Sequence, residues 1–135
     1  MTPGQARRLA RQGALRQKEM LEELHALANS IAKSETLILA LKEQMEAVTV
    51  KHQDRKTTVD DIAYLEDLLR CARKKLDWEK HMAGVAKRTP AVLTKVTEIM
   101  NDTATPPSEE YRQLIMRLLQ VVQEGMTRLG EAKSG

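Results

Sequence analysis

Phenylalanine is absent from this sequence, and its aromatic residues are limited to one tryptophan and two tyrosines. Residues that favour strands over helices are therefore scarce, while the strong helix formers Leu, Ala, Met, Glu, Lys, Arg and Gln dominate. No apolar run approaches the length of a membrane span. The composition predicts a soluble all-α protein, and a chain of 135 residues corresponds to one domain.

Chemically specialised motifs are also missing from the sequence. It has no glycine-rich phosphate loop, no HExxH, no cysteine pair and no nucleophile beside a base, so we expect no enzyme, no catalytic residues and no cofactor. Asp77 and His81 have a spacing that suits two metal ligands, but no third ligand accompanies them, so we expect no metal site. They are interpreted as a contact on a solvated helix face.

The single cysteine, Cys71, excludes an internal disulfide and indicates a cytoplasmic or nuclear protein. Basic neighbours would favour its thiolate form. Its place in an apolar row instead predicts a small buried core residue.

A seven-residue repeat of apolar residues marks the first long segment. One core position holds Leu24, Ile31, Ile38 and Met45, and the other holds Met20, Leu27, Leu41 and Val48. A repeat held over four heptads is typical of a coiled coil. Two polar residues, Ser34 and His52, interrupt it; they either fix the register of the pairing or, for His52, lie in water past the end of the core.

Turn and cap signals divide the rest of the chain. Thr58, with Asp61 three residues later, predicts a helix start, and Pro90 predicts that this helix ends and a short one begins. Ser108 predicts the cap of a last helix. The predicted organisation is a flexible basic arm at residues 1–16 and one helical domain at 17–135, with helices at 17–53, 59–88, 90–101 and 109–129.

These elements predict one architecture. Because a short turn joins the two long helices, we expect them to be antiparallel neighbours. The sequence thus predicts a long coiled-coil-like helical hairpin with a shorter C-terminal helical pair packed on part of it.

The second long helix has two apolar seams, about 110° apart when positions are projected at 100° per residue. The Leu69 seam comprises Ile62, Leu65, Leu69, Ala72, Leu76, Ala83 and Ala86. The Trp78 seam comprises Tyr64, Leu68, Cys71, Trp78, Met82 and Val85. Since a helix must bury both apolar faces, we expect the first helix to cover the Leu69 seam, while the Trp78 seam needs a second neighbour. The C-terminal helices could fold back over it, but they are short and cover only part of the hairpin, so we expect the Trp78 seam to be the partner interface.

The remaining sector of this helix is basic. The basic stripe comprises Arg73, Lys74, Lys80, His81, Lys87 and Arg88, which recur as pairs every seven residues. A helix face that only contacts water is usually charged, but it normally mixes both signs. A face of one sign is consistent with binding an acidic polymer or surface by charge neutralisation.

The first 18 residues hold five basic side chains and no acidic one. The arm is interpreted as a disordered start loosened by Gly4 and Gly13, as a polyanion-binding arm through Arg7, Arg8 and Arg11, or as a mitochondrial transit peptide. The transit-peptide interpretation is weakened because Thr2 is the only hydroxylated residue in the segment.

Two hypotheses about function follow. In the first, the chain is a non-enzymatic structural or adaptor subunit of a larger coiled-coil or helical-bundle complex, bound to a protein partner or to copies of itself through its seams. In the second, the basic stripe and arm bind nucleic acid, tubulin tails or anionic lipid. No small-molecule substrate is expected in either case. Neither hypothesis identifies the complex, or decides between homo-oligomer and hetero-oligomer.

Overall fold

A computed structural model describes residues 2–134, and every regular element in that range is a helix. Helix α1 spans Pro3–Lys51, α2 spans Thr58–Met100 and α3 spans Glu109–Ser134. The expected all-α fold with a long helical hairpin is confirmed. Met1 and Gly135, which the predicted arm and domain include, lie outside the described residues.

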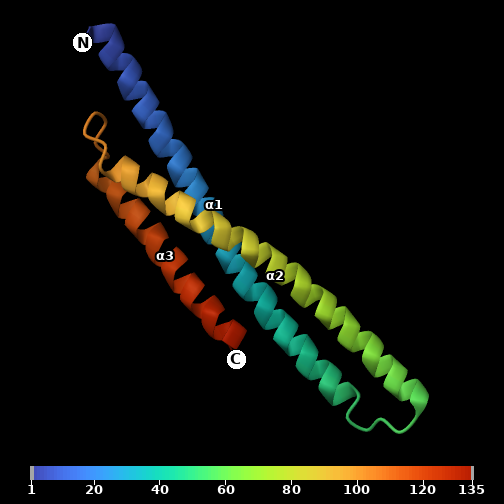
Figure 1. The fold of residues 1–135 in the computed structure, drawn as a ribbon. Helices are drawn as coiled ribbons and strands as arrows, with labels where there is room; N and C mark the ends of the chain where they lie inside the picture. Colours follow the sequence, from blue (N-terminus) through green and yellow to red (C-terminus); the bar gives the residue numbers. More distant parts are fainter. Residues whose placement is uncertain (1, 135) are drawn as a thin grey trace.

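Helix α1 is the central element of the fold. Its 49 residues extend for about 73 Å at 1.5 Å per residue. Helix α2 returns antiparallel to it, and α3 then runs alongside α1, where its last turns reach the level of Ile38 and Leu41, past the middle of α1 (Figure 1). Both α2 and α3 pack on α1 and make little direct contact with each other. The end of the hairpin nearest the turn is therefore only two helices thick.

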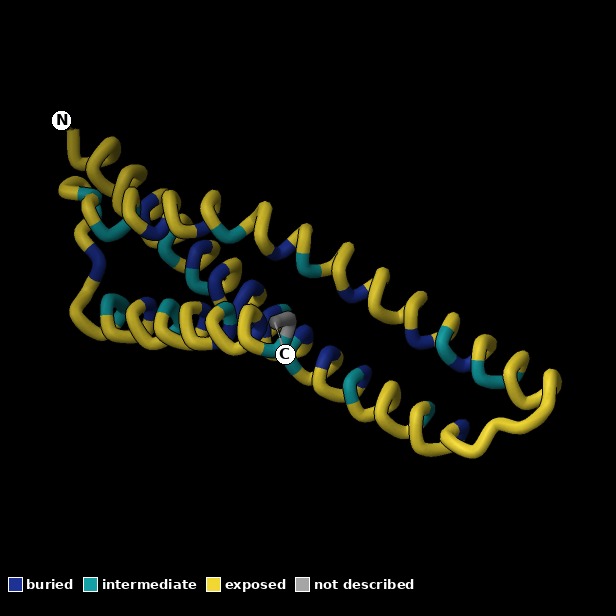
Figure 2. The backbone as a smooth tube through the Cα atoms, turned by 60° about the horizontal axis from the view of Figure 1, so that its bottom comes forward, coloured by how far each residue is buried: buried dark blue, intermediate teal, exposed yellow. Residues whose placement is uncertain are grey.

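The core is built from rows of residues spaced seven apart. Helix α1 contributes Met20, Leu24, Leu27, Ile31, Ile38 and Leu41, as its heptads predict. Helix α2 contributes Cys71, Trp78, Val85 and Val92, and α3 contributes Ile115, Val122 and Leu129. Figure 2 shows buried positions on the facing sides of the helices and mostly exposed positions near the turn. Met45 was predicted to be a core residue but is 42% exposed, and it lines an open pocket with Trp78 of α2 and Ala132 of α3.

Close approaches bring α3 and the loop before it onto α1. Gly125 lies so near α1 that a Cβ added to it would overlap the Cγ2 atom of Ile31. In the same way, a Cβ on Gly13 would overlap the side chain of Thr105 in the α2–α3 loop. The tyrosine hydroxyl of Tyr111 also donates a hydrogen bond to the Gln17 carbonyl oxygen at 2.7 Å. These contacts fix the position of α3 along α1.

The predicted break at Pro90 was wrong, and so was the short helix at 90–101. Helix α2 continues through Pro90, which gives one C-terminal helix in place of a pair. A proline inside a helix leaves the carbonyl four residues earlier without its helical partner. Here Ala86 and Pro90 both lie on the exposed side of α2. Buried Val85, Val92 and Val96 hold the helix against α1 on both sides of the proline.

The helix ends differ from the prediction in three further places. The predicted flexible arm is helical from Pro3, where Thr2 and Gln5 form a capping box. Helix α2 is capped by Thr57 with Asp60, one residue before the predicted pair. Helix α3 continues past Gly130. Its predicted cap is confirmed, because the Ser108 Oγ accepts a hydrogen bond from the Tyr111 backbone N–H at 3.2 Å.

Candidate protein-interaction surface

The Trp78 seam lies inside the fold. Cys71, Trp78 and Val85 are buried, and the other three members of the seam are half-buried. The Trp78 indole N–H donates a hydrogen bond to the Ser34 carbonyl oxygen of α1 at 2.9 Å. Assigning this seam to a partner was therefore wrong. A helical projection gives the angle between two seams, but it does not say which of them meets α1.

The Leu69 seam is the one that faces solvent. Ile62, Leu65, Leu69 and Leu76 are 51%, 56%, 60% and 56% exposed. The three alanines of the seam are exposed as well. An exposed apolar row that continues along one helix for several turns is typical of a protein interface.

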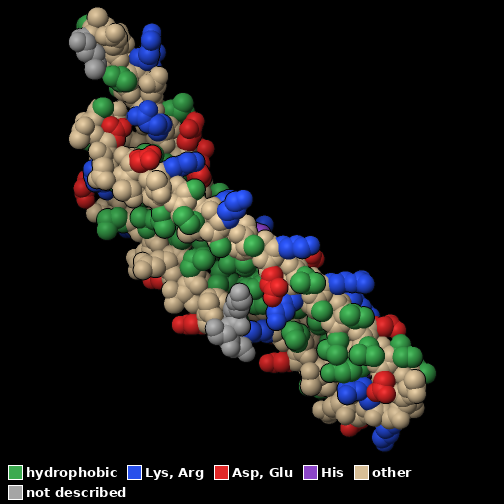
Figure 3. Space-filling model, in the orientation of Figure 1, with side chains coloured by type: hydrophobic (Ala, Val, Ile, Leu, Met, Phe, Trp, Pro, Cys, Tyr) green, Lys and Arg blue, Asp and Glu red, His purple; other side chains and the backbone are tan. Residues whose placement is uncertain are grey.

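A groove between α2 and α3 continues this apolar surface. Its volume is about 320 Å³. The lining residues are Trp78, Glu79, Met82, Ala83 and Ala86 from α2 and Met126, Leu129 and Gly130 from α3. Ala83 and Ala86 belong to both the groove and the Leu69 seam. Figure 3 shows hydrophobic side chains gathered beside the C-terminal end of α3 and toward the hairpin turn.

All six residues of the basic stripe are exposed. The Lys74 Nζ donates a hydrogen bond to the Gln44 Oε1 at 3.0 Å. Among the described residues, none of the six forms an ion pair with an acidic side chain. Asp77 lies on the same face of α2, so the stripe is predominantly rather than uniformly basic, and Figure 3 shows Lys and Arg side chains along the edge that α2 forms.

The basic arm does not join the stripe. Arg7, Arg8 and Arg11 are exposed on the first turns of α1. Arg16, which follows them, pairs with Asp102 in the loop after α2 at 3.1 Å. Since Arg88 precedes Met100, the last residue of α2, by 12 helical rises, the stripe ends about 18 Å before the end of α2 next to this ion pair, and the arm extends beyond it. The arm and stripe are two separate basic regions.

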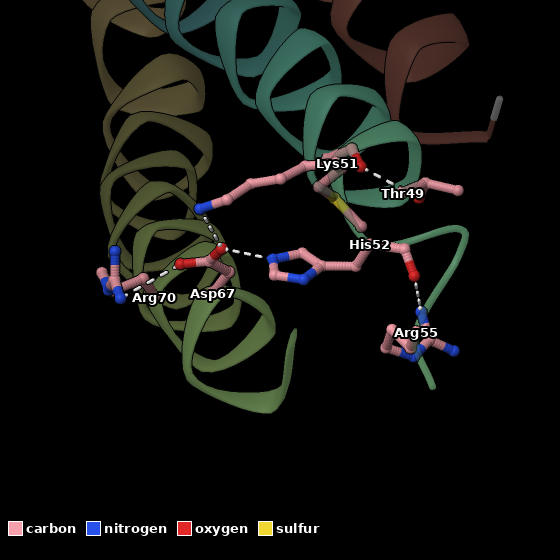
Figure 4. Close-up of polar contacts among 7 residues, drawn as sticks. Thr49, Lys51, His52, Arg55, Asp67 and Arg70 are labelled. Carbon is pink, nitrogen blue, oxygen red and sulfur yellow. Dashed lines mark hydrogen bonds and ion pairs between the residues drawn. The ribbon is translucent and has the colours of Figure 1, made fainter. Parts of the chain in front are cut away.

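A polar cluster closes the hairpin turn (Figure 4). Its acidic member, Asp67, was not predicted, because no local pattern marks it. The Asp67 Oδ2 lies 2.7 Å from the His52 Nε2 and 3.1 Å from the Lys51 Nζ. The Asp67 Oδ1 lies 3.0 Å from the Arg70 Nη2. Hydrogen bonds from His52 and then Lys51 lower the pKa of Asp67 below its usual value of 3.8.

Burial of this cluster decides between the two interpretations of His52. The ring is only 7% exposed, and it meets Tyr64 edge-on with ring centroids 5.5 Å apart. The guanidinium of Arg55 lies over the Tyr64 ring, 3.8 Å from its centroid. His52 thus joins α1 to α2 and fixes their register rather than lying in water. The arrangement is that of a structural clamp.

Asp77 and His81, the possible metal pair, are exposed on α2. Within residues 2–134, no three His, Cys, Asp or Glu side chains are placed together so that they could hold a metal ion. Cys71 is 7% exposed in the core, in agreement with its predicted burial. No helix in the described range has an apolar stretch that could cross a bilayer.

Comparison of the chain with protein-family models, with characterised proteins and with solved structures finds no significant match. The surfaces of the chain itself are therefore the basis for a functional hypothesis.

Proposed function

We propose that the chain is a non-enzymatic structural or adaptor subunit that joins a larger helical assembly by burying the Leu69 seam against a helix of a partner. The observation that carries this proposal is the exposure of Ile62, Leu65, Leu69 and Leu76 on one face of α2. Their heptad spacing is that of a coiled-coil seam, which needs a second helix to cover it.

The seam is not needed to close the fold. Because the Trp78 seam already meets α1, polar substitutions at Leu65 and Leu69 leave the core intact. An interface residue of this kind contributes to binding through the area that the partner covers. Stability of the isolated chain and assembly with a partner are thus separable properties.

The experiment compares two double variants of the tagged full chain, expressed in the cells it comes from. Leu65→Gln with Leu69→Gln changes the seam. Leu37→Gln with Val50→Gln is the control, since Leu37 and Val50 on α1 are 56% and 64% exposed. We expect a stoichiometric complex for the wild type and the control, and an isolated folded chain for the seam variant. A complex that survives in the seam variant would contradict the proposal.

A second candidate function is binding of an acidic polymer or surface, and the unpaired charges of the basic stripe favour it. Binding of this type weakens steeply with salt because counterions are released. Titration of heparin, DNA and anionic vesicles into the wild type and into Lys80→Glu with Lys87→Glu tests it. Affinity that does not change with salt, or that the substitutions leave intact, would exclude this function.

A further inference from the structure

The flank of the Leu69 seam is mainly basic. Residues Ile62, Leu69, Leu76 and Ala83 occupy one seam position of the heptad, and Leu65, Ala72, Glu79 and Ala86 occupy the other. The position next to the seam on its solvent side holds Glu66, Arg73, Lys80 and Lys87. In coiled coils such flanking residues set the choice of partner through ion pairs across the interface. Three of the four flanking residues here are basic.

A second copy of the chain is a poor occupant of this seam. In an antiparallel pair, the same flanking positions of the two helices face each other. When the two seams overlap fully, Arg73 of one copy would then meet Lys80 of the other, and only Glu66 and Lys87 would meet as opposite charges. In a parallel pair the basic flanking residues would meet the positions of Leu68, Lys75 and Met82, of which Leu68 and Met82 are half-buried in their own chain. Self-association through the seam therefore brings like charges together or leaves the flank unpaired.

The shape of the α2–α3 groove also determines which apolar side chains of a partner helix can fit. Ala83 and Ala86 have small side chains, so a large side chain from a partner can enter between α2 and α3. Trp78 and Met126 then provide an apolar floor and wall. Glu79, the one charged residue at a seam position, lies at the rim of the groove and interrupts the apolar row, as register-setting polar residues do.

From these observations we infer that the Leu69 seam and the α2–α3 groove bind an amphipathic helix of another protein, whose flanking positions carry Asp and Glu toward Arg73, Lys80 and Lys87. The inference rests on the proposed function and adds the chemistry of the partner. The track from Ile62 to Ala86 is about 36 Å long, which corresponds to a partner helix of about 25 residues.

The test uses two synthetic helical peptides of about four heptads, with the same Leu and Ile core. One carries Glu and the other Lys at the positions that flank the core, and neither contains Trp. The full chain has a single tryptophan, and Trp78 lines the groove, so its fluorescence reports binding. We expect the Glu peptide to bind about tenfold more tightly than the Lys peptide.

Two variants identify the source of this preference. Arg73→Glu with Lys80→Glu and Lys87→Glu should reverse it, because the flank then favours the Lys peptide. Leu65→Gln with Leu69→Gln should abolish binding of both peptides. Circular dichroism and thermal unfolding establish that each variant is folded, which is expected because all five residues are exposed.

Four outcomes would overturn the inference. Equal affinity for both peptides, lost in the seam variant, would leave the proposed function standing without its charge preference. Full binding of the Glu peptide by the seam variant would show that the peptide binds to the basic stripe by charge alone, as an acidic polymer would, without using the seam. A doubled mass without peptide would identify a second copy as the occupant. Binding of neither peptide, with the cellular complex still lost in the seam variant, would require a partner surface of another kind.

Discussion

The Trp78 indole N–H and the Ser34 carbonyl oxygen form a buried hydrogen bond of 2.9 Å between α2 and α1. Ser34 is fully buried, and its Oγ donates a second hydrogen bond to the Ser30 carbonyl oxygen at 2.8 Å. The pair lies in the middle of the hairpin, close to the end of α3. It ties the register of α1 and α2 at the point where the third helix ceases to support them.

Trp78→Phe should destabilise the fold by about 1 to 2 kcal/mol, because it removes the indole donor while keeping most of the apolar ring. Trp78→Ala should destabilise it by about 3 to 5 kcal/mol through the additional cavity. Urea unfolding followed by circular dichroism measures both. A Trp78→Phe variant as stable as the wild type would show that the hydrogen bond has no net effect.

Gly125→Ala should destabilise the protein by about 1 to 3 kcal/mol, since the new methyl group overlaps Ile31 and pushes α3 away from α1. Gly84 on α2 is the matched control, because nothing lies within 4 Å of a Cβ added there. Gly84→Ala should therefore stabilise the helix by up to about 1 kcal/mol. Denaturant midpoints that rise for both variants would mean that α3 shifts freely on α1.

Thr57→Ala should lower the free energy of unfolding by about 1 kcal/mol. The Thr57 Oγ1 accepts a hydrogen bond from the Asp60 backbone N–H at 3.1 Å, which satisfies one free donor at the start of α2. Thr58→Ala, the neighbouring control, should change stability by about 0.5 kcal/mol or less, as is usual for a surface substitution. The reverse order in thermal unfolding would place the cap at Thr58.

Acid should weaken the clamp at the hairpin turn. A carboxyl whose pKa is lower in the folded chain than in the unfolded one stabilises the fold above its unfolded pKa and loses this effect as the pH falls through its folded pKa. The pKa of Asp67 is lowered by its bonds from His52 and Lys51, so its contribution should be complete at pH 5 to 7 and decline below about pH 4.

Asp67→Asn should accordingly have a lower melting temperature than the wild type at pH 7 and a smaller decrease in that temperature between pH 5 and pH 2. Asp54→Asn is the control, because Asp54 is an exposed carboxylate in the same turn. The Asp60 and Asp102 carboxyls, whose pKa values are lowered chiefly by the backbone N–H groups of Lys56 and Thr105, remain in both variants. Parallel pH curves for the wild type and Asp67→Asn would rule out the clamp as an acid-sensitive contact.

The fold was predicted correctly where the apolar heptads of the sequence coincide with the residues that are buried in the structure. Heptads alone identified the α1 core from Met20 to Leu41, because the apolar repeat is unbroken there except at Ser34. The predicted break at Pro90 was wrong because it considered only the helix-breaking tendency of proline. It did not consider the valines that pack on α1 before and after Pro90 and keep α2 helical. The helical start at Pro3 was also missed, because Gly4 and Gly13 suggested disorder, whereas Thr2 and Gln5 form a capping box there.

The candidate surface was harder to predict. Both seams of α2 are visible as heptads, yet their assignment depends on long-range contacts such as that of Trp78 with Ser34, 44 residues away. The clamp partner Asp67 was missed for the same reason, because its bond to His52 crosses the turn between two helices. The basic stripe could be predicted without knowledge of long-range contacts, and its predicted exposure agrees with the structure.

The central place of α1 has a consequence for the order in which the protein folds. Helices α1 and α2 are neighbours in the chain and can pair soon after both are synthesised, whereas α3 joins last and meets residues about 90 positions earlier. Until then, the side of α1 that carries Ile31 and later receives Gly125 stays open to water. A nascent hairpin of this kind exposes a transient apolar surface, which makes it a substrate for chaperones and prone to pair with other unfinished chains.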